Sequence, residues 1–160
     1  VGLAGGFQGS LSSRDNVRFV CRLFSTTPEE TREKVRFVEE FAEIGKFFDL
    51  PMKTLSSGMR GRVTFGLSLA FEFDYYLIDE GMAAGDPIFR KKAQAAFQAH
   101  VSKGKLILVS HNPKDIQNLC DMVVILEDGQ ATLYNDVKEG LELYQNMQQK
   151  RQQSAKVVGP

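Results

Sequence analysis

The sequence lacks an excess of charge of either sign, and it lacks any long run of apolar residues. Its 160 residues include 20 Lys and Arg and 20 Asp and Glu. This balance argues against a nucleic-acid binder that depends on a generally basic surface, although it leaves room for a local basic patch. No segment approaches the roughly 20 apolar residues that a membrane-spanning helix needs. The composition therefore fits one globular domain with a hydrophobic core.

Cysteine is nearly absent as well. Cys21 and Cys120 lie far apart in the sequence and lack the spacing of metal ligands. We therefore predict two buried, reduced thiols rather than a disulfide.

The first residues resemble neither a signal peptide nor the start of a domain. They read Val1-Gly2-Leu3-Ala4-Gly5-Gly6, which is typical of the middle of a domain. We therefore expect the chain to be a fragment of a longer protein.

The first half of the sequence predicts helices. After a glycine- and serine-rich loop, apolar residues recur at helical spacing, namely Val17, Val20, Cys21 and Phe24. Thr27-Pro28-Glu29-Glu30 predicts a second helix start, with Thr27 as N-cap, Pro28 at the first position and Glu30 reaching back. That helix should carry Phe37, Phe41, Ile44 and Phe48 on one face and end before Pro51. A third helix should run from about Ser57 to about Glu72.

The second half predicts strands alternating with helix. Tyr75–Ile78 and Leu106–Val109 are short apolar runs, typical of strands buried on both faces of a parallel sheet. Residues 88–101 between them predict a crossover helix. Met122–Leu126 predicts a further strand, which a hairpin turn at 127–130 connects to a strand at 131–134. The polar end, 148–160, predicts a frayed helix and tail.

Two acids, Asp79 and Glu80, follow the first predicted strand directly. Ligands of α/β sheets bind at the carboxyl ends of strands, where a carboxylate can hold Mg²⁺ and another can polarise a water. The alternative is that Asp79 only caps a helix in an ordinary α/β protein. The pair alone leaves both interpretations open.

Ser110 and His111 follow the next strand in the same way. A neutral imidazole there can contact a γ-phosphate oxygen or orient a water. A serine-hydrolase site is disfavoured because the sequence has no G-x-S-x-G motif. A purely structural histidine remains the alternative, and by itself the more common one.

Leu55-Ser56-Ser57-Gly58-Met59 predicts a helix start that offers free amides to an anion. A plain serine cap is the alternative. Gly58 in the first turn costs helix stability, and this cost is explained if a ligand must approach the backbone closely there. Arg60 and Arg62 add positive charge nearby or are simply solvated.

Two further residues are weaker candidates. Gln8 lies in a glycine-rich loop that can be no more than a turn. Asp86 precedes Pro87 and is predicted to cap the next helix, which leaves it free to touch a partner chain as well.

The order and spacing of these signals closely resemble the nucleotide-binding subunit of ABC transporters. Within that superfamily the chain looks most like the ATP-binding component of bacterial capsular polysaccharide exporters of the polysialic acid type. The stretches GGFQGSLSSRDNVRFVCRL, LSSGMRGRVTFGLSLAFEFDYYLIDEGMAAGD and LILVSHN carry this closer resemblance, which covers residues 1–145.

The resemblance implies catalytic roles for Glu80, His111 and Gln8 and metal roles for Asp79 and Gln8, with ATP and Mg²⁺ as cofactors. Gln8 would be the Q-loop glutamine that senses Mg²⁺ and water near the membrane subunit. Asp79 would bind Mg²⁺, Glu80 would be the catalytic base and His111 the switch histidine.

The resemblance also implies residues that contact ATP held by the opposite subunit. These are the signature residues Leu55, Ser56, Ser57, Gly58 and Met59, together with the D-loop Asp86. The family's usual LSGGQ is LSSGM here, so the amides survive but a polar side-chain contact is lost. The residues before Asp86 also differ from the usual ones. No G-x-x-x-x-G-K-[ST] occurs in the chain, so the phosphate-binding loop should lie upstream of Val1.

The implied fold is α/β: part of a P-loop NTPase core with an inserted helical subdomain. Its divisions would be a Q-loop region (1–13), a helical subdomain (14–73), the C-terminal part of the RecA-like core (74–147) and a polar tail (148–160). The implied partners are a second nucleotide-binding subunit and an integral membrane permease, with no nucleic acid. The protein would lie peripherally on the cytoplasmic face of the bacterial inner membrane.

Two other functions remain open. One is a soluble ABC-type ATPase of translation or DNA repair, which shares the same site. The other is a truncated, non-catalytic fragment that keeps only the helical docking surface. Whichever function the intact protein has, we expect this chain alone to be inactive and not to bind ATP tightly.

Overall fold

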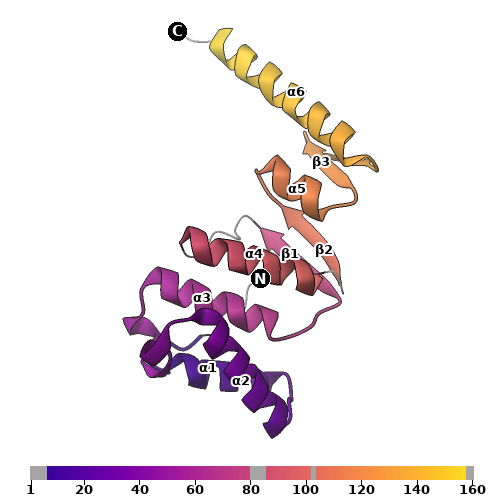
Figure 1. Cartoon of the computed structure of the whole chain (residues 1–160). Coiled ribbons are helices and arrows are strands. Elements are labelled where there is room, and N and C mark those ends of the chain that lie inside the picture. Colours follow the sequence, from indigo (N-terminus) through magenta and orange to yellow (C-terminus); the bar gives the residue numbers. More distant parts are fainter. Residues whose placement is uncertain (1–6, 80–85, 102–103, 158–160) are drawn as a thin grey trace. The chain divides into compact units, whose positions relative to one another are not determined.

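The computed structural model describes residues 7–79, 86–101 and 104–157. They belong to two compact units, Val1–Ile107 and Leu108–Pro160, and each unit is described by itself. The first unit holds a group of helices and a short sheet, and the second holds a hairpin and two helices (Figure 1).

Three α-helices begin the first unit: α1 (Ser13–Leu23), α2 (Pro28–Ala42) and α3 (Ser57–Leu69). Each is capped by a hydroxyl side chain, from Ser12, Thr27 and Ser56. The predicted capping box of α2 is confirmed, because the Glu30 amide donates to Thr27 Oγ1 at 3.2 Å and the Thr27 amide donates to Glu30 Oε2 at 2.7 Å.

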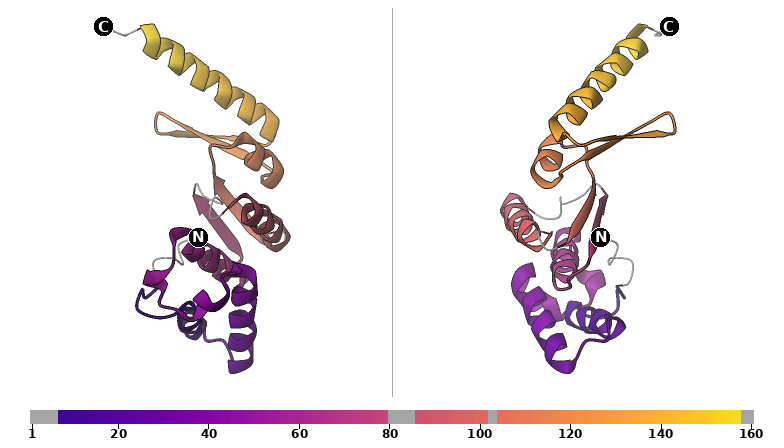
Figure 2. Two further views of the ribbon diagram at one scale, coloured as in Figure 1. Left: turned by 60° about the vertical axis from the view of Figure 1, so that its left-hand side comes forward. Right: turned by 90° about the vertical axis from the view of Figure 1, so that its right-hand side faces the viewer.

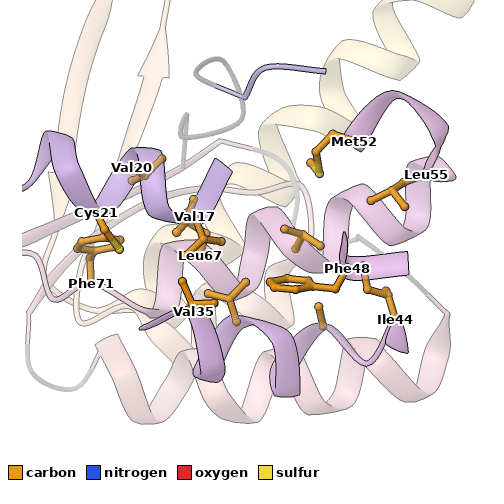
Figure 3. Close-up of a cluster of buried hydrophobic side chains, with 13 residues drawn as sticks. Val17, Val20, Cys21, Val35, Ile44, Phe48, Met52, Leu55, Leu67 and Phe71 are labelled. Carbon is orange, nitrogen blue, oxygen red and sulfur yellow. The ribbon is translucent and has the colours of Figure 1, made fainter. Parts of the chain in front are cut away.

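The apolar faces of these helices meet in one hydrophobic core. Figure 3 shows side chains from α1, α2, α3 and the connection after α2 converging. Val17, Val38, Phe48, Val63 and Leu67 are all fully buried there. This burial, more than helix propensity, holds the three helices together.

The predicted length of the second helix is wrong. The helix α2 ends at Ala42, because Glu43 adopts a left-handed conformation with φ of 50°. Two 3₁₀ helices follow, η2 (Gly45–Asp49) and η3 (Met52–Thr54). The reversal at Glu43 lets Phe48 reach the core from η2, whereas Phe37 stays 40% exposed. Likewise α3 ends at Leu69, short of the predicted Glu72.

A two-stranded sheet pairs β1 (Tyr75–Asp79) with β2 (Lys105–Val109), and α4 (Pro87–Val101) joins the two strands; Lys105–Ile107 of β2 belong to the first unit. The Lys105 amide donates to the Asp74 carbonyl at 2.9 Å, so both strands begin at the same edge, as a parallel pair does. The strands and the crossover helix are therefore confirmed.

The prediction that the strands are buried on both faces of the sheet, however, is wrong for the described residues. Tyr76 and Ile78 of β1 are buried, and the ring of Tyr76 packs edge-on against Phe97 of α4. Tyr75 and Leu77 point the other way and are 57% and 62% exposed. The reason is that α4 covers one face only.

The second unit contains α5 (Pro113–Leu119), β3 (Val123–Glu127), β4 (Gln130–Tyr134) and α6 (Val137–Val157). The predicted hairpin is confirmed: β3 and β4 are antiparallel, with Asp128 and Gly129 both at positive φ in the turn (Figure 2). The helix α6 begins at Val137, well before the predicted polar tail, and α5 was not predicted.

Two negative findings concern the described residues. Of the helices that the structure describes, none combines the length and apolarity needed to cross a bilayer. Cys21 and Cys120 are free thiols, as predicted, but only Cys21 is fully buried; Cys120 is partly exposed.

Candidate functional site

The segment Leu55–Met59 forms the start of α3. Leu55 is buried and anchors the turn in the core. Ser56 caps the helix, its Oγ accepting from the Met59 amide at 3.2 Å. The amides of Ser57 and Gly58 have no acceptor in the described part of the chain. This helix start therefore combines a plain serine cap with two outward donors that suit an anion.

Gly58 leaves open space above this turn. A Cβ added there would find its nearest atom, Ser56 Oγ, 4.0 Å away. Packing within the chain therefore does not require glycine at this position. Its absent side chain instead leaves the backbone accessible to a ligand.

The turn lies at the edge of a surface concavity of about 560 Å³. The concavity is lined by residues from the end of α2, η2 and the starts of α3 and α4: Glu43, Ile44, Phe47, Ser56, Gly58, Met59, Arg62 and Asp86. It thus brings together three of the predicted signature residues and the predicted D-loop aspartate.

Asp86 is the N-cap of α4, as predicted. Its Oδ1 accepts from the amides of Ile88 and Phe89 at 2.9 and 3.0 Å. Its Oδ2 is paired with Arg62, whose guanidinium also lies 4.5 Å over the Phe89 ring. The hydrogen bond from the Phe89 amide and the ion pair with Arg62 together hold the pKa of Asp86 below its ordinary value of 3.8. Arg62 is therefore not simply solvated but ties Asp86 to α3.

A second cation joins α4 to the end of α2. Lys92 donates to Glu43 Oε1 at 2.6 Å and to the Phe41 carbonyl at 3.0 Å. Arg62 reaches the Ala42 carbonyl from α3 at 3.4 Å. The end of α2 is thus tied to both neighbouring helices.

Gln8 is held by a residue that sequence reasoning missed, Asn16 of α1. Asn16 is fully buried; its Oδ1 accepts from the Gln8 amide at 2.8 Å and its Nδ2 donates to the Gln8 carbonyl at 3.1 Å. Its Nδ2 also lies 2.9 Å from the Ser12 carbonyl. A signal existed: Asn16 is a polar residue beside Val17 and Val20 on the apolar face of a helix. The Gln8 side chain itself is exposed.

Asp79, Glu80 and His111 are the remaining predicted residues. Asp79 is the exposed last residue of β1 in the first unit, and Glu80 lies outside the described residues. His111 follows β2 in the second unit and is exposed. Within the described ranges, no three His, Cys, Asp or Glu side chains form a group that could hold a metal. The roles of these residues therefore stay predictions.

Comparison with known proteins gives close relatives. The chain is 52% identical over 145 residues to the polysialic acid transport ATP-binding protein KpsT of Escherichia coli, covering 90% of the chain and 66% of that protein. It is 41% identical over 145 residues to the ATP-binding protein BexA of Haemophilus influenzae, covering 91% of the chain and 65% of that protein. The capsule polysaccharide export ATP-binding protein CtrD of Neisseria meningitidis is 39% identical over 144 residues.

The chain spans about two thirds of the length of these relatives, 66% and 65% for the first two named. A solved structure of the ATP binding subunit of an ABC transporter matches with a TM-score of 0.70 at 18% identity, over 81% of the chain and 55% of that protein. No protein-family model matches. The structural match confirms the predicted α/β fold with its helical segment, which the chain shares with part of that subunit.

Proposed function

Since the chain belongs to the family of capsule polysaccharide export ATP-binding proteins, we propose that it is part of an ATP-hydrolysing subunit of an ABC exporter. The intact subunit would work as a homodimer with an integral membrane permease, on the cytoplasmic face of the bacterial inner membrane. Its cargo would be a capsular polysaccharide.

The observation that carries this proposal is the start of α3. The amides of Ser57 and Gly58 have no acceptor among the described residues, and the glycine leaves open space beside them. Oriented backbone donors at a helix N-terminus bind phosphate oxygens well, because their partial charge is fixed in place. The residues present therefore fit the ATP of an opposing subunit.

Asp86 would act at the same contact between the two nucleotide-binding subunits. Its position is fixed by two α4 amides and by Arg62 of α3, so this aspartate links the start of α4 to α3. Contact of the opposing subunit with either element would therefore reach the other.

Hydrolysis would depend on acids and a histidine that follow the two strands. Asp79, at the exposed carboxyl end of β1, has the ligand type and position for Mg²⁺. When bound, Mg²⁺ would neutralise charge developing on the transferred phosphoryl group. Glu80 would orient and deprotonate the attacking water, and His111 and Gln8 would hold the phosphoryl oxygen and the water in place.

Replacing the base tests the proposal in the full-length protein. Glu80→Gln should abolish ATP turnover while ATP still binds, because an amide cannot accept the proton of the attacking water. Glu142→Gln, an exposed α6 residue with the same charge change, should leave turnover unchanged. Normal hydrolysis by the Glu80 variant would rule out its assigned role. Co-purification with a permease would separate export from a soluble ATPase.

The 160-residue chain alone should not bind ATP tightly, because it lacks the G-x-x-x-x-G-K-[ST] loop and its lysine. Titration of Mg-ATP into the chain by calorimetry should give no micromolar binding. A micromolar dissociation constant would contradict the assignment of the phosphate-binding loop to another part of the protein.

A further inference from the structure

The first unit has a second concavity, far in sequence from the signature turn, between α1 and α2. It has a volume of about 260 Å³, and four of its lining residues are arginines: Arg14, Arg18, Arg32 and Arg36. Glu39 is the one acid among the lining residues that the structure gives. A local basic patch therefore exists within a chain of zero net charge.

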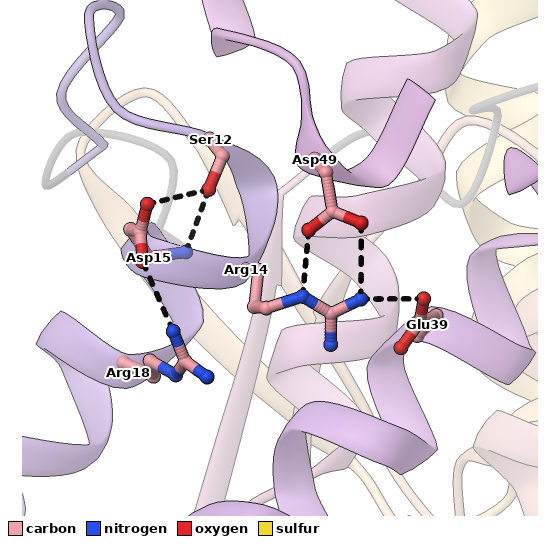
Figure 4. Close-up of polar contacts among 6 residues, drawn as sticks. All are labelled: Ser12, Arg14, Asp15, Arg18, Glu39 and Asp49. Carbon is pink, nitrogen blue, oxygen red and sulfur yellow. Dashed lines mark hydrogen bonds and ion pairs between the residues drawn. The ribbon is translucent and has the colours of Figure 1, made fainter. Parts of the chain in front are cut away.

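Arg14 makes the most polar contacts of the four among the described residues. Figure 4 shows its guanidinium between Asp49 and Glu39. It donates through Nε to Asp49 Oδ1 and through Nη2 to Glu39 Oε1, both at 2.6 Å, and only 24% of its side chain is exposed. Its position over the Phe48 ring, 5.1 Å away, holds it further. This arginine is a preorganised part of the wall.

The next two arginines use few of their donors. Arg18 pairs with Asp15 through Nη1 at 3.3 Å, and Arg32 pairs with Glu29 through Nη2 at 2.5 Å. A guanidinium carries five N–H donors, so most of these groups remain available. Exposed pairs of this kind are also weak and exchange readily with other anions.

Arg36 is the residue that points to a ligand. Among the described residues it forms no ion pair or hydrogen bond, although it lines the concavity. It follows Arg32 by four residues on α2, as Arg18 follows Arg14 on α1. Like charges at this spacing destabilise a helix, and on α2 only Arg32 is paired with a carboxylate, so a bound anion would offset the charge of Arg36.

We propose that this arginine pocket binds a phosphate ester group. A phosphate presents three or more oxygens in different directions, and guanidinium forks from two facing helices can engage several of them at once. A single carboxylate would engage only one of these guanidinium groups. The source of the phosphate ester is either a soluble molecule or a phospholipid headgroup.

The test uses the whole chain and two variants of equal charge. Arg36→Gln removes the free guanidinium without breaking an ion pair, so the fold should stay intact. Arg22→Gln is the matched control, because Arg22 is exposed on α1 outside the pocket. Calorimetric titration with glycerol 3-phosphate should show binding that Arg36→Gln weakens roughly tenfold and Arg22→Gln about twofold or less.

Vesicles separate the two sources. The chain is sedimented with phosphatidylglycerol vesicles, and phosphatidylcholine vesicles are the control. The pocket is assigned to a lipid headgroup if the chain binds phosphatidylglycerol vesicles more strongly than it binds glycerol 3-phosphate, and if this vesicle binding depends on Arg36. Binding of glycerol 3-phosphate without vesicle binding assigns it to a soluble phosphate ester. The proposal is overturned if neither probe binds, if both variants weaken binding equally, or if polyglutamate binds where phosphate esters do not.

Discussion

Replacing Asn16 by alanine should destabilise the first unit and release the Gln8 loop. The fully buried Asn16 side chain accepts from the Gln8 amide at 2.8 Å and donates to the carbonyls of Gln8 and Ser12 at 3.1 and 2.9 Å. Losing a buried hydrogen-bonding side chain costs about 1–3 kcal/mol, and the small cavity left behind adds to that. Since Gln8 is exposed, water can replace part of the loss. We therefore expect a decrease of about 2–3 kcal/mol in the free energy of unfolding.

Urea unfolding followed by far-ultraviolet circular dichroism measures this decrease, since the chain has no tryptophan for fluorescence. The control is Asn146→Ala, at an exposed position of α6, which should change stability by about 0.5 kcal/mol or less. Hydrogen exchange of the Gln8 amide under native conditions should be much faster in the Asn16 variant. Our reasoning would be refuted by equal effects of the two variants, or by unchanged exchange at Gln8.

Three other substitutions or conditions have definite expected outcomes. Gly58→Ala should increase the free energy of unfolding by roughly 0.5 kcal/mol and so raise the unfolding temperature slightly, because alanine favours a helix and the site is open. A lower unfolding temperature in a thermal melt would contradict this. Gly104→Ala should cost roughly 1–3 kcal/mol in urea unfolding, because its Cβ would lie 2.8 Å from the Phe73 carbonyl oxygen; an unchanged midpoint would show that the strand start can shift. Acid should destabilise the first unit, since hydrogen bonds lower the pKa of Asp49 and Asp86 below 3.8 in the folded state. The contribution of these two carboxylates to stability is therefore present above the ordinary pKa of 3.8 and is lost as the pH falls through their lower pKa values in the folded state. Urea midpoints that stay constant from pH 5 to pH 2 would contradict this.

Local signals in the sequence predicted local structure well. The start of α2 could be predicted from Thr27, Pro28 and Glu30, because capping involves only residues within one turn. Asp128 and Gly129 likewise predicted the hairpin, since both tolerate positive φ. The serine cap and open glycine of α3 could also be predicted, because they too depend on neighbouring residues.

Contacts between distant segments could not be predicted in the same way. The spacing of Phe41, Ile44 and Phe48 continues through a chain reversal at Glu43, so periodicity alone implied one long helix. The pairing of Arg62 with Asp86 joins residues 24 apart and needed the fold. The exposed face of β1 was missed because an apolar run does not say how many of its faces are covered.

The left-handed turn at Glu43 has a mechanical consequence. Lys92 of α4 and Arg62 of α3 both fasten to this short stretch of backbone and side chain, at Glu43 and Ala42. A residue held at positive φ has few conformations to exchange between, and two cross-links narrow them further. The joint after α2 is therefore anchored to both α3 and α4, and removing either the Lys92 or the Arg62 side chain would take away one of these two anchors.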